Sequence, residues 1–173
     1  MIYYGSKDMA ESWRTVRKNT VQVAEDIPEE KYSFRAAPDA MSVGEILAHL
    51  AATPHWANQC HFVDQKMAVT MDDFGKWMGE VGQHSKSLTT KAAIVAALKA
   101  DGDAFAAGLE SMTDAKLGET VALPMGTKTR FEMLLGVKEH EMHHRAQLFL
   151  MERMIGIVPH LTRARQAAQA ARS

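Results

Sequence analysis

The chain has 173 residues, of which 46% are hydrophobic and 24% charged, so a disordered tail or a collagen-like fibre is excluded. Its length suits one domain. Lysine and arginine total 20 and aspartate and glutamate total 21, a balance without the basic excess of surfaces that bind nucleic acid or anionic lipid. We therefore expect neither nucleic acid nor a membrane as a partner. A single cysteine cannot form an internal disulfide, and no signal peptide or membrane-length apolar run is visible, so we expect a cytoplasmic protein.

The first predicted helix runs from about Ser6 to Ile27, and Pro28 marks its end. Residues spaced three or four positions apart form one face of an amphipathic helix: Met9, Trp13, Val16, Thr20, Val23 and Ile27. Residues 29–41 show little periodicity, so we expect a connection there.

A second helix is predicted to start at Ser42, because Ser42 and Glu45 form a capping box in which each side chain satisfies a backbone N–H of the first turn. Pro54 should kink this helix, which continues to about Met67. Residues 70–87 contain three glycines and no stable period, which predicts a long excursion or a broken helix.

The third helix is predicted from Thr89 or Thr90 to about residue 112, followed by a connection over residues 113–126. Within that connection only the run TVALPM could form a short extended piece, and strand signals are too weak for a sheet. A second capping box, Thr129 with Glu132, begins a fourth helix that ends at Ile155. We therefore predict an all-α fold, a four-helix bundle, with a single domain over residues 1–159 and a tail or short helix over residues 160–173.

Two of the eight histidines stand one turn apart on the fourth helix. At about 100° per residue, His140 and His144 fall in the middle of its apolar arc. The polar residues of the same helix fall together on the expected solvent face: Lys138, Glu141, Arg145 and Glu152. The two rings could be core histidines that are hydrogen-bonded to buried carbonyls or water. They could equally chelate a transition metal, since this spacing places two imidazoles on one helix face.

A catalytic metal needs about three protein ligands and an open position, so a third ligand is required. On the second helix His49 lies at the flank of the apolar stripe, and His61 lies nearer its centre if the helix stays straight. His55 points away. Helix phase slightly favours His61 and does not settle the choice.

The run Ser42-Val-Gly-Glu-Ile-Leu-Ala-His49-Leu is followed about ninety residues later by His140-x-x-x-His144-Arg-x-Gln147-Leu and a Gly-Ile-x-Pro ending. Together these motifs resemble the DinB (damage-inducible, YfiT-like) family of metal-dependent enzymes. The resemblance implies a four-helix bundle, often a homodimer, with a divalent metal on His49, His140 and His144. The chain departs from the family pattern at Ala146, where members often have glycine.

The chemistry that the resemblance implies follows from the metal, for which Zn, Ni and Fe are all suited to three imidazoles. Members of the wider superfamily imply thiol chemistry, either by S-transferases that use low-molecular-weight thiols or by thiol-dependent isomerases, and a thiol S-transferase acting on small molecules is our leading hypothesis. The alternative is a non-catalytic helical interaction or stress-response module, in which the metal is structural or absent.

Several neighbouring residues have two possible roles. Glu45 could orient a ligating histidine, or it could serve only the capping box. Gln147 could contact substrate or a ring, or lie at a helix–helix seam. Trp56 and Trp77 could help form a substrate pocket or simply pack, and His143 should lie at the edge of the site or on the surface. We expect Cys60 to be a small buried residue rather than a nucleophile.

Overall fold

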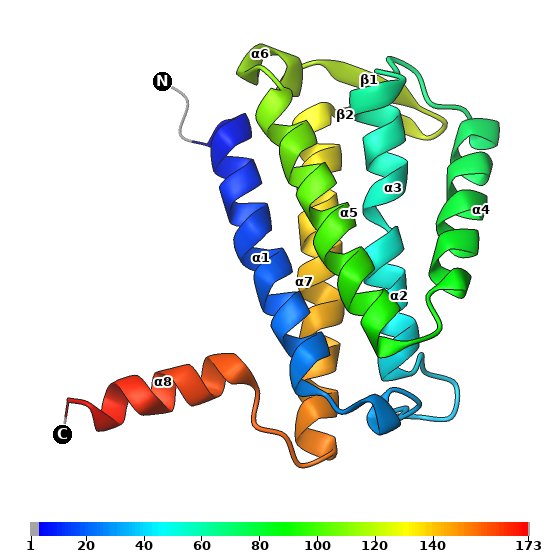
Figure 1. Ribbon diagram of the computed structural model, residues 1–173. Helices are drawn as coiled ribbons and strands as arrows, with labels where there is room; N and C mark the ends of the chain where they lie inside the picture. Colours follow the sequence, from blue (N-terminus) through cyan, green and yellow to red (C-terminus); the bar gives the residue numbers. More distant parts are fainter. Residues whose placement is uncertain (1–3, 173) are drawn as a thin grey trace.

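The structure is a computed structural model that describes residues 4–172. Four helical segments form the bundle, namely α1, α2 with its continuation α3, α5 and α7 (Figure 1). In chain order the elements are α1 (Ser6–Asp26), the 3₁₀ turn η1 (Glu29–Lys31), α2 (Val43–Ala52), α3 (Pro54–Ala57), the π-helical turn η2 (Asn58–Val63), α4 (Met71–Ser87), α5 (Lys91–Ser111), α6 (Asp114–Leu117), β1 (Thr120–Leu123), β2 (Gly126–Thr129), α7 (Arg130–Met154) and α8 (His160–Ala170). The predicted all-α bundle is confirmed.

The helix ends follow local signals. Ser42 caps α2, and Thr129 caps α7, and in both helices the predicted capping box is present. Thr90 caps α5 by accepting from the backbone N–H of Ala93. Gly156, just past α7, has a φ of +86°, the left-handed conformation that glycine adopts after a helix. The first helix also begins and ends within one residue of its predicted bounds.

Pro54 interrupts the second helix as predicted, because it has no N–H to continue the backbone bonding. The helix then ends earlier than expected, at Val63 rather than near residue 67. Its last turn is the wider η2, and Gln65 has a φ of +49°. The π-helical turn rotates its residues, including His61, away from the phase of a straight α-helix, and Gln65 ends the segment.

The prediction of an excursion or broken helix over residues 70–87 is wrong. Thr70 and Asp73 form a third capping box, and α4 is continuous from Met71 to Ser87. The directions of the neighbouring helices explain why a segment of this length is needed. Both α3 and α5 run upward in Figure 1, so the chain between them has to return along the bundle, and α4 covers that distance. A Cβ at Gly75, Gly79 or Gly82 would have no neighbour within 4 Å, so the glycines lie on the outer face of α4. Because glycine is not a polar residue, the alternation of apolar and polar residues that identifies an amphipathic helix is weak here.

The expectation that no sheet forms is also wrong at the top of the bundle. Strands β1 and β2 pair antiparallel as a hairpin, with Leu123 opposite Gly126. Gly126 has a φ of +134°, which explains the glycine at this turn. The predicted extended piece TVALPM is therefore the first strand of a hairpin that leads directly into α7.

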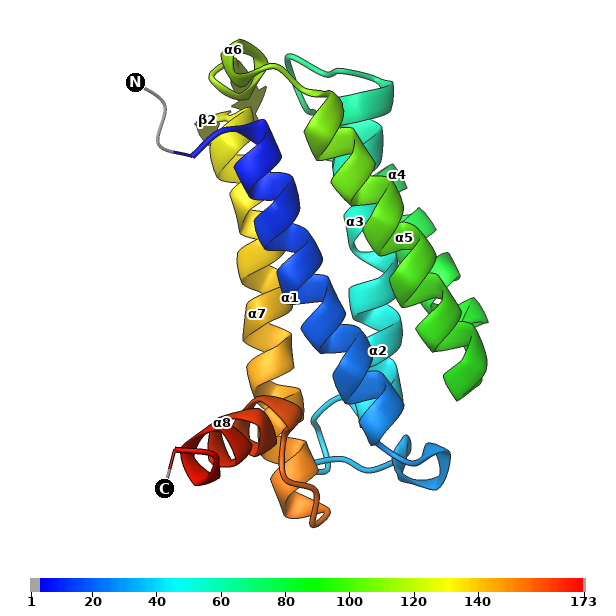
Figure 2. The same ribbon diagram turned by 60° about the vertical axis from the view of Figure 1, so that its left-hand side comes forward.

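The core lies between the four bundle helices. In it the rings of Trp13 and Phe105 pack edge to face, with their centroids 4.7 Å apart. Helix α8 projects sideways from the lower end of the bundle, beside the last turns of α7 (Figure 2). No described residue of α8 is buried. No helix among residues 4–172 combines the length and the apolar character that a membrane span requires. The division into a domain over residues 1–159 and a tail over 160–173 stays a prediction.

The predicted solvent face of α7 is wrong for two of its residues. Glu141 and Glu152 are buried, with 1% and 0% of their surface exposed. This face packs against α1, where Arg145 donates to the Val16 carbonyl oxygen and Lys138 donates to the Ser12 hydroxyl. A polar helix face therefore does not always face solvent. It can also pack against another helix that carries complementary polar groups.

Candidate metal centre

Three histidines from two helices meet near the middle of the bundle. His140 and His144 come from successive turns of α7, and His49 faces them from the last turns of α2. One ring nitrogen of each lies within 4.8 Å of the others, and the Nε2 atoms of His49 and His140 are 3.0 Å apart. Within residues 4–172 this is the group of histidine, cysteine and acidic side chains with the spacing of a metal site.

Burial keeps these imidazoles neutral. It lowers the pKa of His140 to about 4, with further lowering by the neighbouring His144 and His49. Burial is also the main cause that lowers the pKa of His49 and of His144. Neutral imidazole is the form that binds a divalent transition metal, so no proton has to be displaced from the set near pH 7.

The proton positions are set by contacts around the rings. Gln147 Oε1 lies 2.8 Å from His144 Nδ1, and because an amide oxygen can only accept, this contact places the proton on Nδ1 and leaves Nε2 free. The Gln147 amide also reaches exposed His143, at 3.3 Å. Nδ1 of His140 is buried without a hydrogen-bond partner among the described residues. The rings thus meet each other rather than the carbonyls expected of ordinary core histidines, and the donor set fits a metal ion.

Glu45 is occupied elsewhere. One carboxylate oxygen accepts from the Ser42 N–H at 2.8 Å, and the other pairs with Arg35 at 2.7 Å. The capping role weighed for Glu45 is therefore present. On the far side of the triad, Thr53 donates to the His49 carbonyl oxygen at 2.7 Å, and its hydroxyl lies 3.5 Å from His49 Nε2.

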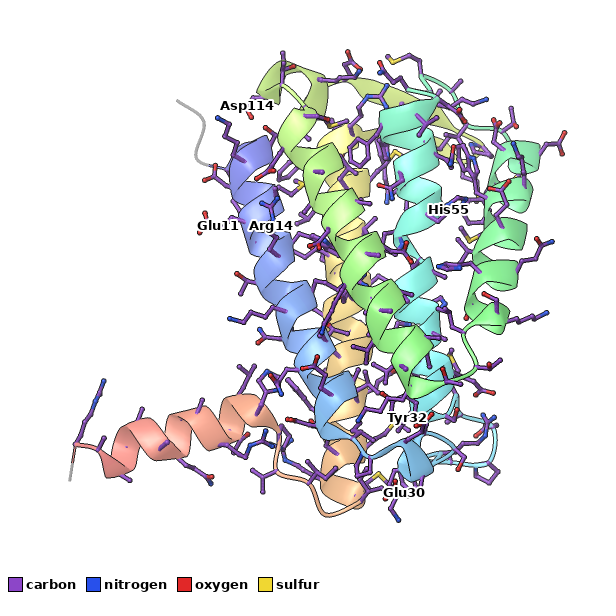
Figure 3. The ribbon with its side chains drawn as sticks, in the orientation of Figure 1. Glu11, Arg14, Glu30, Tyr32, His55 and Asp114 are labelled. Atoms are coloured by element: carbon purple, nitrogen blue, oxygen red, sulfur yellow. The ribbon has the colours of Figure 1, made fainter. Side chains whose placement is uncertain are left out.

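The remaining histidines of α3 and η2 are used in other ways. His61 is buried beside Arg130, whose Nη1 lies 3.2 Å from His61 Nδ1, and it does not join the triad. His55 points from α3 toward α4, where it contacts Glu80 at 2.9 Å (Figure 3). Cys60 is fully buried, and burial raises the pKa of its thiol to about 11. The structure therefore brings His49 rather than His61 to the pair on α7.

A cavity of about 560 Å³ adjoins the triad. His49 and His140 form part of its wall, α4 and α7 form its sides, and the β1–β2 hairpin lies at one end. Trp56 and Trp77, both weighed as pocket residues, are among the residues that line it. Thr53, Phe74 and Val81 were not identified as site residues from the sequence. A correct helix assignment for residues 70–87 would have placed Phe74, Trp77 and Val81 on one face.

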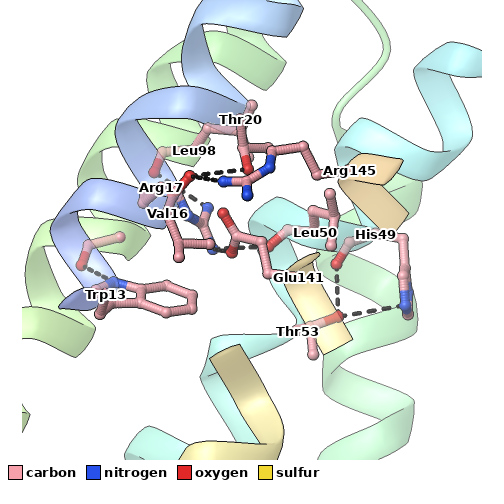
Figure 4. A network of polar contacts seen from close by, with 11 residues as sticks. Trp13, Val16, Arg17, Thr20, His49, Leu50, Thr53, Leu98, Glu141 and Arg145 are labelled. Atoms are coloured by element: carbon pink, nitrogen blue, oxygen red, sulfur yellow. Dashed lines mark hydrogen bonds and ion pairs between the residues drawn. The ribbon is translucent and has the colours of Figure 1, made fainter. Parts of the chain in front are cut away.

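A buried ion pair supports the two helices that carry the triad (Figure 4). Arg17 of α1 and Glu141 of α7 lie 2.8 Å apart, with 5% and 2% of their side chains exposed. Arg17 also donates to the carbonyl oxygens of Leu50 and Leu98. Leu50 is the residue after His49 on α2, and Glu141 is the residue after His140 on α7. Arg17 therefore links the two helices next to the positions that carry two of the three histidines.

The network was missed from sequence although a signal was present. Arg17 stands four residues after Trp13 and three before Thr20, in the same arc as the apolar face of α1. Gly102 makes room for it, since a Cβ there would lie 2.7 Å from Arg17 Cγ. A charged residue in an apolar arc needs a buried partner, here supplied by the supposed solvent face of α7.

Comparison with solved structures shows the same fold elsewhere. A DinB-like protein from Bacillus subtilis matches with a TM-score of 0.66 at 23% identity, over 86% of this chain and 92% of that one. A mycothiol-dependent maleylpyruvate isomerase matches with a TM-score of 0.61 at 11% identity, over 83% of this chain and 60% of that one. None of the curated proteins compared with the chain matches it.

A third structure corrects an expectation. The colibactin self-resistance protein ClbS, solved in complex with double-stranded DNA, matches with a TM-score of 0.63 at 13% identity, over 88% of this chain and 98% of that one. Our exclusion of nucleic acid on the basis of net charge is therefore wrong, because this fold occurs in a DNA complex. A net charge sums the whole surface and says nothing about a local patch.

A sequence model of the DinB superfamily matches residues 12–148, which include all three histidines of the triad, the whole of α2 and most of α7. The match covers most of the chain, and the fold agrees with it. The chain belongs to the DinB superfamily.

Proposed function

We propose that the protein is a metal-dependent enzyme in which His49, His140 and His144 hold a divalent transition metal. The observation that carries this proposal is the convergence of three neutral imidazoles at the wall of an apolar cavity. Three protein ligands leave a position free for exchange, whereas a structural site is closed by four. A divalent ion bound there would favour the thiolate form of a thiol and would polarise a substrate.

The reaction we propose is the transfer of a low-molecular-weight thiol to a small molecule: the sulfur forms a bond to an electrophilic carbon, the leaving group departs with the electron pair of the bond that breaks, and the thiol proton passes to solvent. The thiol must come from outside the chain, because Cys60 is buried and its raised pKa keeps it protonated. A mycothiol-dependent enzyme with this fold supports thiol chemistry by analogy. The residues of the chain then have separate tasks: the triad holds the ion, Gln147 orients His144, and the apolar cavity wall excludes water from the substrate.

The metal part of this proposal is tested on protein purified without a polyhistidine tag. After loading with Zn, Ni or Fe in turn, elemental analysis should find about one ion per chain with at least one of these metals. His144→Ala should remove it, whereas His84→Ala, a histidine on α4 paired with Asp101, should leave it. A stoichiometry near zero in the unmodified protein with every metal would refute the proposal.

The catalytic part needs turnover. The metal-loaded protein is mixed with several cellular thiols and a panel of electrophiles, and thioether formation is followed by mass spectrometry. We expect conversion that is lost after chelation and in His140→Ala. Bound metal without metal-dependent conversion in any combination would favour a non-catalytic interaction module.

We also propose that the chain functions in the cytoplasm as a homodimer. A free cysteine suits a reducing compartment. Large apolar side chains remain exposed along α7, namely Met142, Leu150 and Met154, and a second copy could cover them. Sedimentation analysis should find twice the mass of the chain, and a mass equal to one chain would exclude the dimer.

A further inference from the structure

The cavity beside the triad is an open cleft with the size of a small-molecule site. Its volume of about 560 Å³ lies in the range usual for such sites, and it is bounded by α3, α4, α7 and the β1–β2 hairpin. Two imidazoles of the triad, His49 and His140, belong to its wall. A molecule in the cavity would therefore reach the triad directly, whereas a protein surface would contact only the rim.

The wall of the cavity is apolar and rich in rings. Trp77 and Val81 of α4 are buried in it, and Trp56 faces it from α3. At the rim Phe74 and Met125 expose 46% and 99% of their surface. Such side chains bind apolar and aromatic molecules, since ring contacts add to the gain from burying apolar area.

The polar groups on the wall are mostly engaged already. The Thr53 hydroxyl donates to the His49 carbonyl, and the Glu132 carboxylate accepts from Thr129 in the capping box of α7. Apart from the imidazoles of the triad and Lys128, which is exposed, few groups remain to recognise a polar ligand such as a sugar. The chemistry of the wall selects against such ligands, because their hydroxyl groups would lose water without gaining partners.

A glycine keeps the cavity open. Gly136 lies in the interior of α7, one turn before His140, and it lines the cavity. A Cβ at this position would meet nothing within 4 Å, so close packing does not require the glycine. Glycine is second only to proline in disfavouring a helix interior. A larger side chain would fit the fold but would fill space next to the triad.

We propose that the cavity between α4 and α7 binds an apolar, ring-bearing small molecule, and that this is the substrate class presented to the triad. The inference rests on the proposed function for the reaction, but binding itself needs no metal. Gly136 is a specificity residue in this account, because its missing side chain provides the space next to His140.

The test is a fluorescence titration of the chelator-treated, full-length protein with N-phenyl-1-naphthylamine, a neutral two-ring probe that brightens in apolar surroundings. The unmodified protein should bind one probe per chain, with energy transfer from its tryptophans. Gly136→Leu should weaken binding roughly tenfold or more, because the leucine occupies the volume that the probe needs. Gly79→Leu is the matched control: it makes the same change in a helix, also into open space, on a residue that does not line the cavity, and it should leave affinity unchanged.

Two further variants keep the result interpretable. Phe74→Ser, at the exposed rim, should weaken probe binding about fivefold through the loss of one ring contact. This variant replaces Gly136→Leu as the test of the cavity if Gly136→Leu does not fold. His144→Ala should lose metal but still bind the probe, because His144 does not line the cavity. Probe binding by an unmodified protein that takes up no metal when it is loaded with Zn, Ni or Fe would refute the proposed function and leave this inference standing. Unsaturable binding, or equal effects of Gly136→Leu and Gly79→Leu, would overturn the inference.

Discussion

Replacing Arg17 with methionine tests the buried ion pair behind the triad. The substitution keeps most of the aliphatic stem but leaves Glu141, with 2% of its side chain exposed, without its cation. Removal of one partner from a buried pair costs about 3–5 kcal/mol, since an uncompensated charge remains in the interior. Folded domains have only about 5–15 kcal/mol of stability in total, so the variant should unfold at much lower urea concentration.

The assay is urea unfolding followed by far-ultraviolet circular dichroism for Arg17→Met, Glu141→Leu and the double variant. We expect the double variant to recover most of the loss, because two apolar groups need no compensation. The coupling energy of the cycle should reach about 2 kcal/mol. A loss below about 1 kcal/mol in Arg17→Met, or a double variant with the summed loss of both singles, would refute the reasoning.

The same variants carry a pH signature. Burial raises the pKa of Glu141 above its ordinary value of 4.5 even beside Arg17, and removal of the cation should raise it further. The folded state of Arg17→Met then holds a proton that the unfolded state loses above pH 4.5. Its unfolding free energy therefore falls as the pH rises, and its deficit against the unmodified protein should be larger at pH 8 than at pH 5.

Three other predictions follow from single sites. Burial and the charge of Asp26 raise the pKa of Glu152 from 4.5 to about 7, so the folded state binds more protons between these values and stability falls as pH rises through that window. Glu152→Gln should remove this slope and stabilise the protein at pH 8 by up to about 3 kcal/mol, and an unchanged slope in urea titrations would contradict the assignment. Gly102→Ala should destabilise the protein by roughly 1–3 kcal/mol, because the new methyl group would meet Arg17 Cγ at 2.7 Å, and a calorimetric melting temperature at or above the original would argue against that clash. Gly79→Ala should instead stabilise it by about 1 kcal/mol, since open space surrounds that position and alanine favours a helix, and a lower melting temperature would show a contact that the structure lacks.

Local signals predicted most of the bundle. Apolar spacing and side-chain caps are short-range, and they gave the starts of α2 at Ser42 and of α7 at Thr129. The helix over residues 71–87 was missed because its outer face carries glycines, which show no hydropathy period. What requires that helix is the distance between the end of η2 and the start of α5, and this is a property of the whole fold.

The site was only partly readable for a similar reason. His140 and His144 share one uninterrupted helix, so their spacing alone placed them together. The choice between His49 and His61 depended on the phase after Pro54, and the break at Thr53 and the π-helical turn change that phase. The partners Arg17 and Glu141 stand on different helices, and nothing in either local pattern identifies the other.

The measurement that tests the central claim most directly is zinc binding by calorimetric titration of untagged, metal-free protein, compared between His49→Ala and His61→Ala. Both variants remove one imidazole, but only His49 lies with His140 and His144. We expect one ion per chain in the unmodified protein, loss of that binding in His49→Ala, and retention in His61→Ala. Retention in His49→Ala with loss in His61→Ala would contradict the account, as would the absence of binding in the unmodified protein when zinc, nickel and iron are each titrated.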